Sequence, residues 1–235
     1  MDPISYALED NIARVQLDDG KANAMYLPWF ETLNRALDQA EKDKPGAVVI
    51  QGRAGMFSAG LNLKVLPTLS AEDLRTTLTV FGRTMLRVFT FPIPTVAAIT
   101  GHAVAGGAML AFACDQRHMA EGPFRLHLNE TAIGLILPTW AITIAQASVP
   151  HRWHTEAILH ARAYSPDEAL EKALIDGVSR PAERLIDDAR AAATLLGALD
   201  QNAYAQSKAR MRAMIVKWAT DVLETETLGR APGSS

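Results

Sequence analysis

The sequence has one cysteine, no excess of basic residues and no long uninterrupted apolar run. A single thiol, Cys114, cannot build a disulfide framework or a cysteine-rich metal site, and its apolar neighbours indicate a buried, unreactive side chain. The formal net charge of −3 gives no broad basic field, so we expect no nucleic-acid partner. The apolar runs are too short and too rich in glycine to span a bilayer, so we expect no membrane partner.

Targeting and metal-binding patterns are also missing. Residues 1–5 lack the basic and apolar regions of a secretory signal, and residues 231–235 do not form a Ser-Lys-Leu peroxisomal address. The six histidines have no metal-ligand spacing, and we expect no metal. With 49% hydrophobic and 21% charged residues, the composition is that of an ordinary globular protein, which we expect to be cytoplasmic.

Strands and helices alternate along the first part of the chain. Residues 4–8 and 12–17 predict a β-hairpin, and residues 47–50 and 95–99 are apolar enough for strands that are buried on both faces. Apolar residues at helical spacing predict helices after residues 24 and 70, and short strands are expected at 117–120 and 124–128. This rhythm, without a dinucleotide-binding fingerprint, predicts an α/β fold with a largely parallel, buried sheet.

From residue 138 the chain becomes mostly helical. Helices are expected at 139–148 and 153–161, after the cap at Ser165, and as two long helices at 181–196 and 200–223. We divide the chain into a core at 1–180 that holds the site and a C-terminal helical region at 181–235. The last helix carries an apolar face made of Tyr204, Met211, Ile215, Trp218 and Val222. That face predicts an oligomerisation surface; alternatively, the two helices only cover their own domain.

Two stretches predict backbone N–H groups at loop ends. The pair Gly106-Gly107 follows the strand at 95–99 and precedes an apolar helical run, so N–H groups are exposed at a helix N-terminus that favours an anion. No basic residue follows, and neither phosphate-binding glycine motif is present, which favours a transient oxyanion over a phosphate. The alternative is that the glycines serve only tight packing. A second small-residue loop, 58–60, follows the strand at 47–50, and two converging donors would form an oxyanion hole.

Four stretches together resemble the enoyl-CoA hydratase/isomerase (crotonase) family. They are FSAGLNLK, IPTVAAITGHAVAGGAMLAFACD, residues 21–25 and residues 128–131, and the resemblance covers residues 12–177. The pattern Asn129-Glu130-Thr131, Gly134 and 138–140 is most similar to the Δ3,Δ2-enoyl-CoA isomerases. The resemblance implies a crotonase-like spiral of β-β-α repeats with a C-terminal helical region. It also implies a homotrimer or a dimer of trimers, and an acyl-CoA substrate whose coenzyme A replaces any separate cofactor.

The resemblance also implies roles for particular residues. The N–H groups of Leu61 and Gly106 are expected to form the oxyanion hole, and Glu130 matches a family glutamate that acts as a general base. Without the resemblance, Glu130 reads as a surface or capping residue. Hydratases of the family usually carry a second glutamate at the position of Met109, which cannot accept a proton. One carboxylate is enough to shift a double bond, whereas adding water uses two, so Met109 favours an isomerase.

Substrate-binding residues follow from the same resemblance. Lys21 and Lys64 flank the two loops and are candidates for the coenzyme A phosphates; ordinary solvated charges are the alternative. Ala22, Ala24 and Ala59 are their backbone neighbours. Met109 and Trp140 are expected in the acyl pocket, and core packing is the alternative for Trp140. The competing activities are a hydratase, lyase or thioester hydrolase of the same family, or a catalytically silent binding protein.

Overall fold

Two β-sheets form the centre of the protein, which a computed structural model describes over residues 2–226. Within these residues the larger sheet has six strands, in the order β1 (Ile4–Glu9), β2 (Ile12–Leu17), β3 (Ala47–Gln51), β5 (Thr95–Ile99), β7 (Gln116–Ala120) and β9 (Gly177–Ser179). The first pair is antiparallel and every later pair is parallel. The smaller parallel sheet consists, in the same residues, of β4 (Gly55–Ser58), β6 (Gly101–Val104) and β8 (Leu126–His127).

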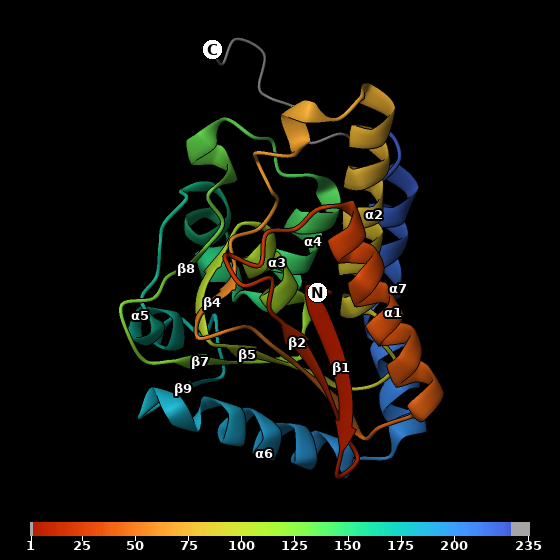
Figure 1. Ribbon diagram of the computed structural model, residues 1–235, viewed down its shortest axis with the longest axis vertical. Coiled ribbons are helices and arrows are strands. Elements are labelled where there is room, and N and C mark those ends of the chain that lie inside the picture. The colour runs from red at the N-terminus through yellow and green to blue at the C-terminus, as the bar shows by residue number, and fades with distance from the viewer. Residues whose placement is uncertain (1, 227–235) are drawn as a thin grey trace.

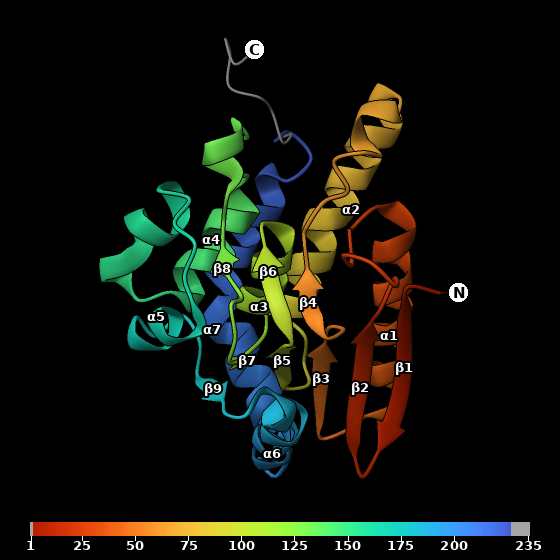
Figure 2. The ribbon, with the colours of Figure 1, turned by 60° about the vertical axis from the view of Figure 1, so that its left-hand side comes forward.

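The strands alternate between the two sheets in a spiral. In each of the pairs β3–β4, β5–β6 and β7–β8, the first strand joins the larger sheet and the second joins the smaller one. A helix follows each pair: α2 (Ala71–Phe89), α3 (Gly106–Ala113) and α4 (Thr139–Ser148). The hairpin β1–β2 is followed by α1 (Leu27–Asp43). Figure 2 shows β4, β6 and β8 side by side. The expected spiral of β-β-α repeats is confirmed.

The larger sheet is covered on both faces, which explains its uninterrupted apolar strands. In β3, Val48 and Ile50 belong to the main core, whereas Ala47 and Val49 belong to a second core. That second core lies against α6 (Leu185–Gly197), which packs across β3, β5 and β7 (Figure 1). Because successive strand residues point to opposite faces, all four side chains are buried, as the sequence predicted.

The helices begin where the sequence places their caps. The Ser70 side chain accepts a hydrogen bond from the Asp73 N–H at the start of α2, and Ser165 and Glu168 form a capping box on α5 (Pro166–Glu171). A 3₁₀ turn, η5 (Ala182–Arg184), leads into α6. The last helix is α7 (Gln201–Val222). None of the helices in residues 2–226 is long and apolar enough to cross a membrane. Residues 227–235 of the expected C-terminal region lie outside the described residues.

Three secondary-structure expectations were wrong. The helix expected at 153–161 is a 3₁₀ turn, η3 (His151–Trp153), followed by a π turn, η4 (Thr155–Leu159). Its buried residues Ala157 and Ile158 are adjacent, and exposed residues follow them, so no continuous apolar stripe supports a longer helix. The strand expected at 124–128 shrinks to the two residues of β8. Segments 55–58 and 101–104, for which no strand was expected, are strands β4 and β6.

Candidate active site

The two glycine loops meet at the ends of neighbouring strands. Because β4 and β6 are parallel, the loops that follow them start at the same edge of the smaller sheet. A Cβ at Gly60 would lie 2.8 Å from the backbone nitrogen of Gly106, and a Cβ at Gly107 would collide with the Ser58 carbonyl. Gly60 also has φ of +80°, which favours glycine. The glycines therefore allow two backbone segments to touch.

Two N–H groups that donate no hydrogen bond within the described residues lie at this contact. The Met25 N–H donates to the Gly60 carbonyl at 2.8 Å, and the Asn62 N–H donates to the Met25 carbonyl at 2.8 Å. Leu61, between them, turns its own N–H away from Met25. Gly106 is the first residue of α3, so its N–H has no partner within the helix. Within residues 2–226 neither N–H donates a hydrogen bond.

Ala105 fixes the direction of the second N–H group. Its backbone has φ of 51° and ψ of −120°, a conformation that side-chain-bearing residues avoid and that typically costs about 1–3 kcal/mol. Hydrogen bonds on both sides hold it: its N–H donates to the His127 carbonyl, and its carbonyl accepts from the Met109 N–H, both at 2.9 Å. The strained turn therefore joins β6 to α3 with the Gly106 N–H at the helix start.

Asn23 joins the N-terminal segment to the first loop. Its buried amide donates to the carbonyls of Leu17 at 2.9 Å and Phe57 at 3.0 Å. The backbone carbonyl of Asn23 accepts a hydrogen bond from the Ser58 hydroxyl at 2.7 Å. Asn23 lies in the family-like stretch 21–25, and the sequence alone predicts no role for it. The signal in the sequence is the residue type, because asparagine adopts a positive φ, here 48°, more readily than most residues do.

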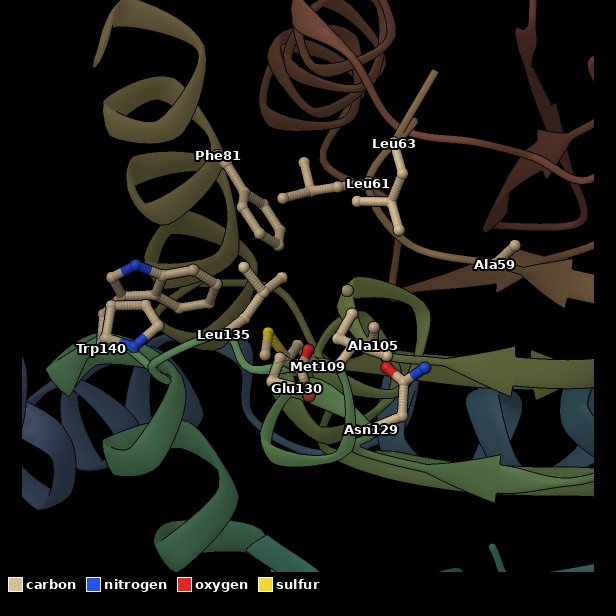
Figure 3. Close-up of a pocket in the computed structure, with 13 residues that line it drawn as sticks. Ala59, Leu61, Leu63, Phe81, Ala105, Met109, Asn129, Glu130, Leu135 and Trp140 are labelled. Carbon is tan, nitrogen blue, oxygen red and sulfur yellow. The ribbon is translucent and has the colours of Figure 1, made fainter. Parts of the chain in front are cut away.

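A cavity of about 50 Å³ lies beside the two N–H groups. It brings together most of the residues that the sequence predicted for the site, and Figure 3 shows the side chains from α2, α3, α4 and the loops pointing into it. Its lining consists of Ala59, Leu61, Leu63, Phe81, Ala105, Gly106, Met109, Asn129, Glu130, Ile133, Leu135, Pro138 and Trp140. A neighbouring apolar groove of about 520 Å³ shares Leu61, Leu63, Ile133 and Leu135 with it. Ala59, Leu61, Gly106, Met109, Glu130 and Trp140 are thus gathered at one site.

Glu130 is the carboxylate that lines this cavity. It begins the 3₁₀ turn η2 (Glu130–Ile133), and the strand expected at 124–128 does not reach it because β8 stops at His127. The residue is 4% exposed, and its Oε2 has no hydrogen-bond partner within residues 2–226. Burial raises the pKa of its carboxyl from 4.5 to about 7, although the N–H groups of Glu130 and Asn129 oppose the shift. A carboxylate with this pKa suits general-base catalysis near neutral pH.

Of the expected coenzyme A contacts, Ala59 lines the cavity and the other four lie outside it. The Ala59 N–H donates to the Ala22 carbonyl at 3.0 Å, so the stretch 21–25 runs beside the first loop. Ala22 and Ala24 are half-buried, whereas Lys21 and Lys64 are exposed. None of these four residues lines the cavity. Their role in binding coenzyme A stays a prediction.

Comparison with known proteins identifies the family. A sequence model of the enoyl-CoA hydratase/isomerase family matches residues 7–228. The chain belongs to this family. It is 38% identical over 190 residues to a putative enoyl-CoA hydratase from Thermus thermophilus, with 78% of this chain and 73% of that protein covered.

Solved structures of the family have the same fold. An enoyl-CoA hydratase/isomerase family protein from Pseudomonas syringae matches with a TM-score of 0.90 and 32% identity, covering 95% of this chain and 96% of that one. The human mitochondrial Δ3-Δ2-enoyl-CoA isomerase matches with a TM-score of 0.90 and 27% identity, covering 95% of this chain and 88% of that one. The resemblance found in the sequence is thereby confirmed, and the protein is an enzyme of a family that acts on acyl-CoA substrates.

Proposed function

We propose that this enzyme is an acyl-CoA double-bond isomerase that converts a 3-enoyl-CoA into a 2-enoyl-CoA. One observation supports this above the others. Among the described residues that line the cavity, Glu130 is the one carboxylate, and it shares the cavity with Leu61 and Gly106, whose N–H groups lack partners. A base and an oxyanion hole are the two groups that a proton shift next to a thioester carbonyl requires.

The proposed reaction has two proton transfers. The Glu130 carboxylate removes a proton from C2 of the substrate, and the electron pair of that C–H bond forms a dienolate. The N–H groups of Leu61 and Gly106 hold the resulting negative oxygen, and the loss of one such donor typically costs about 3–4 kcal/mol. Protonated Glu130 then gives its proton to C4, the C2–C3 double bond forms, and the carboxylate is regenerated.

Met109 favours isomerisation over hydration. It is 2% exposed and lines the cavity from α3, at the position where hydratases of the family usually carry a second glutamate. A thioether neither accepts a proton nor orients a water molecule for attack at C3. Glu130 alone can carry a proton between C2 and C4, so the remaining groups suit the isomerase reaction.

Hydration of a 2-enoyl-CoA is the second candidate activity. The 38% identical relative from Thermus thermophilus is named as a putative enoyl-CoA hydratase, which supports this alternative. In that reaction Glu130 would have to activate the water and also supply the proton to C2. The two activities differ in product, so one assay separates them.

Oligomerisation is part of the proposal. The apolar face expected on the last helix is partly exposed: Met211 is 71%, Trp218 55% and Ile215 36% accessible, whereas Tyr204 and Val222 are half-buried. In contrast, α6 covers the sheet of its own chain. We infer that α7 contributes to a homotrimer or a dimer of trimers, in which a neighbouring chain covers these side chains.

Incubation with 3-hexenoyl-CoA and, separately, with crotonyl-CoA tests the proposed function. The isomerase proposal predicts a conjugated 2-enoyl product from 3-hexenoyl-CoA and negligible addition of water to crotonyl-CoA. Hydration of crotonyl-CoA at a rate equal to or above isomerisation would favour the second candidate. Turnover of neither substrate would contradict both.

A further inference from the structure

The end of α7 reaches the side chains that form one wall of the cavity. Leu223, directly after α7, is buried against Gly82 of α2. A Cβ at Gly82 would collide with the Leu223 side chain and would lie 2.8 Å from the indole nitrogen of Trp140. The Trp140 ring meets the Phe81 ring edge-on, with 4.7 Å between centroids. Leu223 therefore packs beside the two aromatic residues that line the cavity.

Three residues later, Glu226 binds the first residue of α4. Its Oε2 accepts a hydrogen bond from the Thr139 N–H at 2.6 Å, and its Oε1 accepts one from the Thr139 hydroxyl at 2.5 Å. Pro138, at the N-cap position, provides no side-chain cap. A carboxylate is also favoured at the positive end of a helix dipole. Glu226 thus supplies, from 87 residues away, the cap that the local sequence lacks.

Residues 223–226 form a short segment that we name the C-terminal clasp. The N–H groups of Thr225 and Glu226 both donate to the Val222 carbonyl at 3.0 Å, which turns the chain back after the helix. Glu224 forms an exposed ion pair with Arg83 of α2 at 2.5 Å. The clasp therefore contacts both α2 and α4, at positions adjacent to Phe81 and Trp140 in the sequence.

We propose that Glu226 is a positioning residue that fixes the first turn of α4, and with it Trp140, so that the cavity can hold the acyl end of a thioester. This inference rests on the proposed function in treating the cavity as the acyl site. Without the Glu226 carboxylate, the first turn of α4 opens in a fraction of the molecules. The apparent affinity for an acyl-CoA then falls in proportion to the fraction of molecules whose first turn is still folded. If the carboxylate stabilises the helix start as much as a usual N-cap residue does, its removal reduces the affinity for an acyl-CoA by up to about five-fold.

The loss should depend on the acyl chain. The coenzyme A end is expected at exposed Lys21 and Lys64, outside the cavity, and the acyl end is expected against the wall that Trp140 forms. Binding of free coenzyme A should therefore survive the loss of Glu226, and the additional affinity provided by an acyl chain should fall. A general loosening of the fold would weaken both ligands equally.

Calorimetric titration with coenzyme A and with octanoyl-CoA, which has no double bond to move, tests this inference. The dissociation constant of coenzyme A divided by that of octanoyl-CoA measures how much affinity the acyl chain adds. We expect Glu226→Ala to reduce this ratio up to about five-fold, and Glu226→Gln, which keeps one acceptor oxygen, to reduce it less. Asp221→Asn is the matched control: it removes a nearby exposed carboxylate of α7 that lies outside the clasp, and it should leave the ratio unchanged.

An unchanged ratio in Glu226→Ala, or equal weakening of both ligands, would overturn the inference. If Glu226→Ala does not fold, two milder variants test the cap: Thr139→Val removes the hydroxyl hydrogen bond, and Glu226→Gln keeps one acceptor oxygen. An unchanged ratio in both variants would also overturn the inference. Because the titration needs no turnover, it remains valid if the isomerase assignment fails. If the isomerase assignment is wrong, the native protein will bind octanoyl-CoA but will not convert 3-hexenoyl-CoA.

Discussion

Replacement of Glu130 by glutamine should stabilise the protein above neutral pH. Burial raises the pKa of this carboxyl from 4.5 to about 7, so the folded protein holds the proton more tightly than the unfolded chain does. The favourable contribution of the Glu130 carboxyl to the free energy of unfolding is complete below pH 4.5. It falls as the pH rises from 4.5 to 7 and is lost above pH 7. Glutamine is neutral at every pH and avoids the cost of a buried, ionised carboxylate.

The size of the effect follows from the shift. A difference of about 2.5 pKa units between the folded and unfolded states corresponds to about 3 kcal/mol, because each unit is worth about 1.4 kcal/mol. For a protein of this length, that amounts to an increase in Tm of about 6–12 °C at pH 8. At pH 4 the native carboxyl is protonated, and the two proteins should differ little.

Thermal unfolding of the native protein and Glu130→Gln between pH 4 and pH 8 measures this difference. The stability advantage of the variant should grow steadily across the range from pH 4.5 to pH 7. A variant that is no more stable than the native protein at pH 8, or whose advantage is largest at pH 4, would refute the reasoning. Such a result would mean that the Glu130 carboxylate is well solvated or paired in the folded protein.

Three further predictions concern the residues around this carboxylate and the exposed face of α7. Met109→Glu places a carboxylate opposite the thioester and should introduce measurable hydration of crotonyl-CoA, detected as loss of the conjugated absorbance; native-like absence of hydration would argue against Met109 as the determinant. Ala105→Gly should raise stability by about 1 kcal/mol, because relief of backbone strain exceeds the entropic cost of glycine; denaturant unfolding that shows a loss would contradict the strain. Trp218→Asp should give smaller species than the native protein in sedimentation velocity, and a native protein that is a stable monomer at micromolar concentration would exclude the proposed oligomer.

The loops of the site could be predicted because their chemistry is local. Gly106-Gly107 lies between an apolar strand and an apolar helix, and that order alone places unpaired N–H groups at a helix start. The raised pKa of Glu130 was also foreseeable, since Leu128, Ile133 and Leu135 lie close to it in the sequence. Its position in a turn was not, because β8 is only two residues long and leaves no pattern.

Features that depend on distant contacts could not be predicted. Strands β4 and β6 are four residues each and contain glycine, so neither has a strand pattern; each is a strand because its neighbour lies alongside. Ala105 carries no sequence signal for a positive φ, because the hydrogen bonds that hold it come from the surrounding fold. The cap on α4 joins Thr139 to Glu226, and no local rule connects positions 87 residues apart.

The role of Glu130 as the base of a double-bond shift is tested most directly by steady-state kinetics of Glu130→Gln with 3-hexenoyl-CoA. The variant keeps the shape of the side chain and the two N–H donors, so KM should change little. Its kcat should fall by at least about 10²–10⁴-fold. The reason is that, among the described residues, no second carboxylate lines the cavity and could act as the base in place of Glu130. In deuterated water, the native enzyme should carry some protium from C2 to C4, since one group performs both transfers. A Glu130→Gln enzyme that isomerises at a near-native rate would contradict the account.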